Sequence, residues 1–254
     1  MRRHLFSPVS SGPSASQQYP SHRDSLPRAD ASRHIFSWDE LYLQERSNYA
    51  TDPSDEGTVW FEDSSAEDKI LSYLTEKPQL SLPSTRFLDL GTGNGHLLFS
   101  LRDDACFEGD LVGIDYSHQS IELARQIAER RDSRGIRFAQ WDMLNDEPGP
   151  WLEECGGPFD VVLDKGTFDA ISLSSDLDVE GRRSCESYAG RVAPLVKDGG
   201  LLLVTSCNWT EEELRSWLES PETQFEFLES IPYPTFAFGG KQGQTVCSVV
   251  FRRT

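Results

Sequence analysis

The sequence predicts an α/β fold: a mostly parallel, doubly wound sheet of seven strands, with helices on both faces and an antiparallel strand pair at its C-terminal end. Two observations predict it. Short apolar runs alternate with amphipathic helical patterns from residue 64 to residue 220, which is typical of parallel strands joined by crossover helices. After residue 220 two apolar runs are separated by a loop without a helical pattern, so these last strands are expected to pair antiparallel.

The helices are predicted from caps and from apolar residues at helical spacing. The first has Ser65 as its N-cap, and the third has its apolar stripe over 121–128. The fourth ends at a turn made by Gly199 and Gly200, and the fifth begins with a capping box of Thr210 and Glu213. The predicted helices cover 64–77, 96–104, 117–131, 184–196 and 210–220.

The strands are predicted from short apolar runs bounded by glycine, charged and turn residues. They lie within 85–90, 110–117, 136–144, 159–166, 201–207, 225–233 and 245–253. In open α/β sheets the ligand binds beyond the carboxyl ends of the strands, where the strand order reverses. Functional residues are therefore expected where the strands end.

Residues 1–34 differ in composition from the rest of the chain. They are rich in serine and proline, carry five arginines and two aspartates, and show no apolar periodicity. This composition predicts a disordered leader. A mitochondrial presequence is the alternative, but the four prolines would break the amphipathic helix that such a signal needs. We therefore expect the folded domain to span 35–254.

The net charge of −18 limits the partners of this chain. An acidic protein repels nucleic acid phosphates and anionic membrane surfaces, so a basic partner is favoured and neither nucleic acid nor membrane is expected. The sequence has no apolar run long enough to span a membrane. Its five cysteines are odd in number and never form a CxxC pair, which favours a reducing compartment and no metal site.

A glycine-rich loop, DLGTGNG, follows the first predicted strand at residues 89–95. Gly91, Gly93 and Gly95 permit a tight turn and a close approach of the backbone to a ligand. A dinucleotide-binding fingerprint would need glycine where this chain has His96. Asp89 suits the positively charged amino-acid end of S-adenosylmethionine better than a pyrophosphate. A purely structural turn is the alternative.

Two further strand ends carry candidate cofactor-binding residues. Asp115, followed by Tyr116, closes the second strand 24 residues after Gly91. An acid at about this distance accepts hydrogen bonds from both ribose hydroxyls in nucleoside-binding folds, or it caps the next helix, a role that Ser117 could fill. After the third strand, Asp142 could accept from the adenine amino group while Met143 packs on the ring, although a turn would also explain the aspartate.

These motifs, in the order DLGTGNG, GIDYS, WDML and LDKGTFDAI, resemble the seven-strand class of S-adenosylmethionine-dependent methyltransferases. Four stretches resemble, more narrowly, the eukaryotic protein-lysine methyltransferases that act on translation elongation factor 1-alpha. The resemblance covers about 36–254, and the chain departs from the pattern in its leader and in the acidic linker SSDLDVEGRRS. The four stretches are GTVWFED (57–63), DKGTFDAISL (164–173), TSCNWTEEEL (205–214) and FAFGGKQGQTVCSVVF (236–251).

The resemblance implies a Rossmann-like methyltransferase fold, S-adenosylmethionine as cofactor and translation elongation factor 1-alpha as protein substrate. Methyl transfer is an in-line displacement by a lysine nitrogen that has lost its proton, whose ordinary pKa is about 10.4. Asp164 is expected to guide the lysine in and to accept its proton or orient it. Asp169 either does the same or caps the following helix. Lys165 would repel a sulfonium, so an ion-pair or backbone-shaping role is favoured for it.

Aromatic residues are expected to border the substrate. Phe168 and Trp209 could form the walls of a lysine channel. Trp60, in the stretch DPSDEGTVWF, could belong to a lid over cofactor and peptide, although clustered aromatics more often pack in a core. Cys207 is expected to be a small buried residue rather than a nucleophile.

Two other functions stay open at this point. One is a methyltransferase for another protein or a small metabolite, and the other is a cofactor-binding module without catalysis. Enzymes of this superfamily that methylate planar nitrogens carry an Asn/Asp-Pro-Pro-aromatic turn where this chain has Asp164, Lys165, Gly166 and Thr167, which weakens that alternative. A cytoplasmic monomer, with the nucleus as a further location, is expected.

Overall fold

The computed structural model describes residues 38–174, 177, 181–234, 236–238 and 241–254, with the backbone alone at 236–238 and 241–243. The predicted leader and part of the acidic linker lie outside these residues. In the part of the chain that is described, no helix has both the length and the apolar character needed to cross a bilayer.

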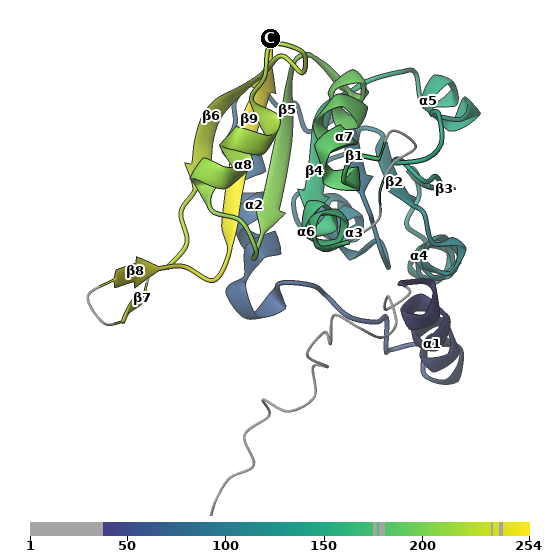
Figure 1. Cartoon of the computed structure of the whole chain (residues 1–254). Helices are drawn as coiled ribbons and strands as arrows, with labels where there is room; N and C mark the ends of the chain where they lie inside the picture. Colours follow the sequence, from purple (N-terminus) through teal and green to yellow (C-terminus); the bar gives the residue numbers. More distant parts are fainter. Residues whose placement is uncertain (1–37, 175–176, 178–180, 235, 239–240) are drawn as a thin grey trace, which may run out of the picture. The chain divides into compact units, whose positions relative to one another are not determined.

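The core of the fold is a seven-stranded sheet with the order β3-β2-β1-β4-β5-β9-β6 (Figure 1). The pairs that join β3 through β5 are parallel, and β9 lies antiparallel between β5 and β6. This confirms the predicted fold class, including the antiparallel end. The strands are β1 (Phe87–Leu90), β2 (Leu111–Asp115), β3 (Ile136–Gln140), β4 (Phe159–Lys165), β5 (Val196–Ser206), β6 (Phe225–Ile231) and β9 (Cys247–Arg253).

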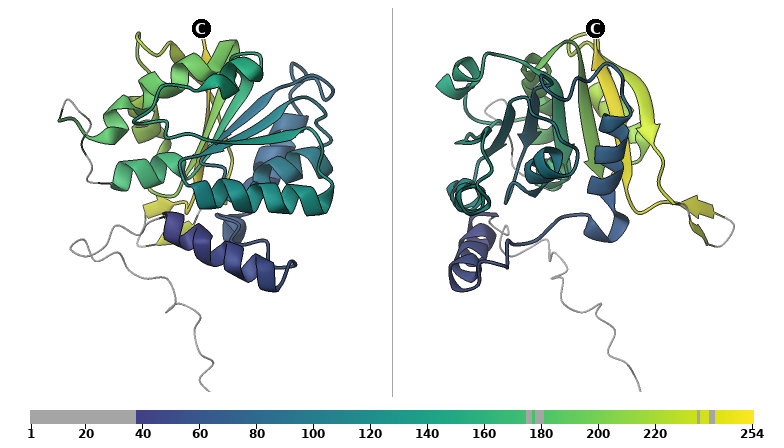
Figure 2. Two further views of the ribbon diagram at one scale, coloured as in Figure 1. Left: turned by 90° about the vertical axis from the view of Figure 1, so that its right-hand side faces the viewer. Right: turned by 180° about the vertical axis from the view of Figure 1, so that it is seen from behind.

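Helices cover both faces of the sheet (Figure 2). One apolar cluster joins α2, α3 and α4 to alternate strand residues such as Leu163 and Leu203, and the other joins α6, α7 and α8 to Val162 and Val204. The alternation of strand side chains between two buried faces is what a doubly wound sheet requires. The helices are α2 (Ala66–Thr75), α3 (His96–Asp103), α4 (His118–Arg131), α5 (Pro150–Glu154), α6 (Thr167–Leu173), α7 (Ser184–Val192) and α8 (Glu211–Leu218).

Several elements were not predicted. Helix α1 (Trp38–Thr51) precedes the sheet, α5 and α6 are short helices between predicted elements, and β7 (Phe236–Phe238) pairs with β8 (Lys241–Gly243) in a separate hairpin. Two short 3₁₀ helices also occur, η1 (Glu62–Ser64) and η2 (Ala193–Leu195).

Two boundaries and one helix cap differ from the predictions. Gly199 and Gly200 do not close a helix; they lie inside β5, at an irregularity in its pairing with β4, and Gly199 has a φ of +77°. The third strand ends at Gln140 because the residues that follow form a turn. Ser65 is at the N-cap of α2 as predicted, but its left-handed backbone leaves its side chain without a capping hydrogen bond.

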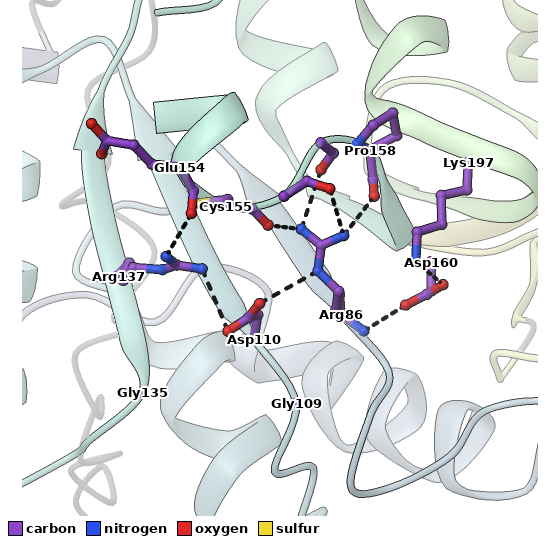
Figure 3. Close-up of polar contacts among 12 residues, drawn as sticks. Arg86, Gly109, Asp110, Gly135, Arg137, Glu154, Cys155, Pro158, Asp160 and Lys197 are labelled. Carbon is purple, nitrogen blue, oxygen red and sulfur yellow. Dashed lines mark hydrogen bonds and ion pairs between the residues drawn. The ribbon is translucent and has the colours of Figure 1, made fainter. Parts of the chain in front are cut away.

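Arg86 forms hydrogen bonds and an ion pair that link the amino ends of the central strands (Figure 3). Its guanidinium donates to the carbonyls of Cys155, Gly157 (3.2 Å) and Pro158 (3.0 Å), just before β4, and lies 3.4 Å from a carboxylate oxygen of Asp110, just before β2. Five donors in a planar fork suit such a set of carbonyls. Arg86 therefore stabilises the amino ends of the strands, and a ligand site is expected at their carboxyl ends.

Candidate active site

A cavity lies where β1 and β4 end. β1 has β2 on one side and β4 on the other, so this is the point where the strand order reverses and where ligands bind in such sheets. Residues from the glycine loop, α1, α2, α3 and the end of β4 line it. The lining includes Tyr42, Trp60, Glu67, Asp89, His96 and Lys165.

The glycine loop takes the predicted form, and the structure adds a reason for two of its glycines. Gly91 and Gly93 have φ values of +62° and +57°, which disfavour a side chain. A Cβ on Gly91 would overlap the Thr167 hydroxyl, and one on Gly93 would overlap the Tyr42 hydroxyl. Gly95 is the N-cap of α3. The loop therefore permits close approach of other parts of the protein as well as of a ligand.

Asp89 borders the cavity at the end of β1. It is 3% exposed, and burial raises the pKa of its carboxyl to about 7. A buried carboxylate gains most from a cationic ligand that compensates its charge. The predicted partner, an ammonium group, fits this position.

Asp115 holds the glycine loop against α4. One carboxylate oxygen accepts from Gly93 N (3.1 Å) and Ser120 Oγ (2.9 Å), and the other accepts from Ser117 N (2.9 Å). Ser117, and not Asp115, is the N-cap of α4, so the alternative role of Asp115 as the helix cap is wrong. Tyr116 is 46% exposed. Contact of Asp115 and Tyr116 with a ribose stays a prediction.

Asp142 forms the turn that follows β3. Its Oδ1 accepts from the backbone N–H groups of Leu144 (3.0 Å) and Asn145 (3.2 Å), and its Oδ2 accepts from the Asn145 side chain (2.8 Å). Met143 is 7% exposed and packs in the core with Trp141. The turn that was the alternative explanation is thus present, and an adenine contact stays a prediction.

The sequence had indicated that Asp164 faces a substrate, but the structure buries it. It is 1% exposed, and its carboxylate accepts from the backbone N–H groups of Thr167 (2.9 Å) and Phe168 (3.0 Å) and from the Tyr188 hydroxyl. Burial raises the pKa of Asp164 to about 7. The sequence missed this role because Tyr188 comes from α7, far along the chain.

Asp169 and its aromatic neighbours form a second buried group. Asp169, 5% exposed, accepts from Ser206 Oγ and Cys207 N (2.8 Å) and so fixes the end of β5 to α6. Phe168 is 1% exposed, so it lies in the core rather than on a channel wall. Trp209 is half-buried, and its indole donates to Ser172 (2.9 Å).

Cys207 is exposed, not buried as predicted. Burial of its thiol atoms and the neighbouring Asp169 raise the pKa of this thiol to about 11. A thiol with so high a pKa is a poor nucleophile near neutral pH, which agrees with the expectation that Cys207 is not one.

Helix α1 and the segment after it cover the cavity. Trp60 is 38% exposed, packs edge-on against Trp38 with ring centroids 5.3 Å apart, and borders the cavity together with Tyr42. On α1, Asp39 accepts from Ser117 Oγ (2.7 Å) at the start of α4. The predicted lid position of Trp60 is compatible with this arrangement, and contact with a ligand stays a prediction.

Two site residues, Glu67 and His96, were not recognised in the sequence. Glu67 lies 3.3 Å from Lys165 Nζ and 2.7 Å from His96 Nδ1. The pairing with Glu67 confirms the ion-pair role predicted for Lys165. Lys165 also donates a hydrogen bond to the Trp60 carbonyl (3.1 Å). No local sequence pattern distinguishes Glu67 from an ordinary acidic residue in the first turn of a helix.

Comparisons with known proteins agree with this geometry. A family model described as a methyltransferase domain matches residues 81–242. The chain is 43% identical to the protein-lysine N-methyltransferase EFM4 of Saccharomyces cerevisiae over 84% of its own length and 91% of that protein. It is 35% identical to the human EEF1A lysine methyltransferase 2 over 85% of its length and 84% of that protein. The chain belongs to this family of protein-lysine methyltransferases.

The fold of this methyltransferase also agrees with solved structures. The magnesium protoporphyrin IX methyltransferase of Synechocystis with bound S-adenosylmethionine superposes with a TM-score of 0.54 at 16% identity, over 84% of this chain and 97% of that one. At so low an identity the likeness concerns the fold alone.

The residues that line the cavity of the methyltransferase suit S-adenosylmethionine, the cofactor of the family. When bound, S-adenosylmethionine supplies an electrophilic methyl group on a positively charged sulfur. The buried carboxylate of Asp89 suits the ammonium of its methionyl part, and the glycine loop gives the backbone close access. Asp115, at the end of the next strand, stays the residue predicted for the ribose.

Proposed function

We propose that this methyltransferase transfers methyl groups from S-adenosylmethionine to a lysine of translation elongation factor 1-alpha. The observation that carries the proposal is its identity of 43% and 35% to EFM4 and to EEF1A lysine methyltransferase 2, over most of each chain. The stretches DKGTFDAISL and SCNWT, which border the cavity and the end of β5, support the same substrate.

In this proposal Asp164 and Asp169 hold neighbouring backbone in place and do not contact the reacting atoms. The Asp164 carboxylate caps α6 through two backbone N–H groups and so shapes the Lys165–Thr167 turn beside the cavity. Asp169 fixes the end of β5 to the same helix. A rigid turn is what alignment of a nitrogen behind a methyl group requires, since misplacement by an ångström is costly to the rate.

The target lysine must be uncharged when its nitrogen attacks the methyl group, and burial favours this. A lysine nitrogen that leaves water for an apolar channel loses its proton more readily, because desolvation lowers its pKa. In this proposal Trp209, which is half-buried beside the exposed Cys207, and the exposed Trp60 line such a channel. We propose the cytoplasm as its location and the monomer as its form.

Mass spectrometry of translation elongation factor 1-alpha, from cells with and without this chain, tests the substrate. We expect at least one lysine to lose its methyl groups when the chain is absent. An unchanged methylation pattern at every lysine would contradict the proposal. Labelling of a different protein by the purified enzyme would then assign it another substrate of the same chemistry.

Asp164→Ala tests the positioning role with purified proteins. We expect methyl incorporation to fall at least about tenfold, because the turn loses its cap and the Tyr188 hydroxyl loses its partner. Asp132→Asn is the matched control, since its carboxylate is largely exposed (78%) and far from the cavity residues in sequence. Full incorporation by a folded Asp164→Ala variant would show that the cap is dispensable.

A further inference from the structure

Three ionisable side chains meet beside the cavity from three different elements. Glu67 comes from α2, His96 from the first residue of α3 and Lys165 from the last residue of β4. Glu67 lies between the other two, with one oxygen 2.7 Å from His96 Nδ1 and the other 3.3 Å from Lys165 Nζ. Because an ionised carboxylate only accepts, His96 donates from Nδ1, which fixes its tautomer.

Glu67 is a buried charge held by these two partners. It is 9% exposed, and its Oε1 accepts no hydrogen bond from the described residues, so the ion pair with Lys165 is what compensates that oxygen. Burial by itself raises the pKa of a carboxyl, yet His96 and Lys165 hold the pKa of Glu67 below its ordinary value. Glu67 is therefore an anion in the folded protein.

Lys165 needs such a partner because of where it lies. Its ammonium borders the same cavity as Asp89 and acts on that buried carboxylate electrostatically. Without Glu67, Lys165 could be compensated by Asp89, on which it already acts electrostatically. Either Asp89 would then be occupied by an internal cation, or the positive charge of Lys165 would stand uncompensated beside a cofactor that is itself positively charged.

We infer that Glu67 is a positioning residue that holds and neutralises Lys165, so that Asp89 stays available to the cofactor and the cavity distinguishes the charged sulfonium from its uncharged product. S-adenosylmethionine carries one positive charge more than S-adenosylhomocysteine, which is left after methyl transfer. By cancelling the positive charge of Lys165, Glu67 removes a repulsion that would act on the charged substrate form of the cofactor and not on the uncharged product form.

Calorimetric binding of both cofactor forms tests this inference without any protein substrate, so its failure is separate from a failure of the proposed function. In Glu67→Gln we expect the Kd for S-adenosylmethionine to rise about tenfold or more, because a charge interaction inside a protein is worth this much. The Kd for S-adenosylhomocysteine should rise several-fold less. A loosened structure would weaken both forms equally, and that result would overturn the inference.

A second substitution separates charge from packing. In Glu67→Gln/Lys165→Met the unpaired cation is gone, so we expect most of the lost affinity for S-adenosylmethionine to return. Lys165→Met alone should bind it at least as tightly as the wild type, even if Glu67→Gln folds poorly. Weaker binding by both Lys165 variants, with wild-type thermal unfolding, would refute a neutralising role for Glu67.

Glu229→Gln is the matched control. Glu229 also pairs with a lysine, Lys77, at 2.6 Å, but on β6 and away from the cavity lining. Its loss should leave the ratio of the two Kd values unchanged. A change of that ratio equal to the one in Glu67→Gln would show that any lost ion pair has this effect.

Discussion

Asp89 and Asp164 are buried carboxyl groups at the ends of neighbouring strands, and burial raises the pKa of each to about 7. In an unfolded chain the pKa of an aspartate is about 3.9. The folded protein therefore holds these protons at a pH where the unfolded chain has released them. Their stabilising effect is complete below the unfolded pKa and is lost as pH rises through about 7.

This difference predicts an unusual pH dependence. Between pH 6 and 8 we expect the free energy of unfolding to fall by about 1 kcal/mol for each of the two groups, because only the folded protein still has to ionise them. Denaturant unfolding at several pH values measures this. Asp89→Asn should remove about half of the slope and Asp132→Asn none of it; an Asp89→Asn slope equal to that of the wild type would contradict the prediction.

The contact between Gly93 and Tyr42 gives a second prediction for single residues. Gly93→Ala should lower the free energy of unfolding by about 2 kcal/mol or more, since a Cβ there meets both a left-handed backbone and the Tyr42 hydroxyl. Tyr42→Phe in the same chain should restore part of the loss by removing that oxygen. Denaturant unfolding of the four chains gives the coupling, and strictly additive effects would rule out the contact.

At the scale of elements, the carboxyl ends and the amino ends of the central strands have different roles. The carboxyl ends carry the cavity and its cover, α1. The amino ends are held by Arg86, whose guanidinium binds the carbonyls of the loop between α5 and β4 and lies near Asp110 before β2 (Figure 3). The amino ends therefore support the fold, while the carboxyl ends carry the cavity.

Arg86→Lys tests this division. We expect the free energy of unfolding to fall by about 1 to 3 kcal/mol, because an ammonium cannot reach all of these carbonyls at once. The Kd for S-adenosylmethionine should stay near the wild-type value. Arg134→Lys, at a side chain that is 87% exposed, is the control. Loss of cofactor affinity in a stable Arg86→Lys protein would show that the two ends of the strands are coupled.

The whole molecule carries a net charge of −18. Such a field attracts cationic surfaces and repels polyanions, and its range shortens as salt is added. This favours a substrate that presents lysine and other basic residues over any nucleic acid. The buried cavity is screened much less than the surface.

Ionic strength should therefore affect the two ligands differently. Between about 0.05 and 0.5 M salt we expect kcat/KM for the protein substrate to fall several-fold and the Kd for S-adenosylmethionine to change little. Steady-state kinetics and calorimetry measure these quantities. A kcat/KM that is constant or rises with salt would show that the acidic surface does not steer the substrate.

Local patterns predicted much of the fold and part of the site. Apolar runs and caps located most strands and long helices, and the parallel arrangement placed Asp89, Asp115 and Asp164 at one edge of the sheet. Helix α1 was missed because a buried polar residue, Glu45, interrupts its apolar positions. Helix α6 was missed because its seven residues follow β4 directly.

The sequence by itself determined the α/β class, the glycine loop and the family, since these depend on residues that are close together in the chain. Only the tertiary structure decided which charges compensate one another. Asp164 is buried against Tyr188 of α7, and Lys165 pairs with Glu67 of α2. Whether a carboxylate faces a ligand or supports the protein depends on distant residues that burial brings into contact, and no local pattern records those contacts.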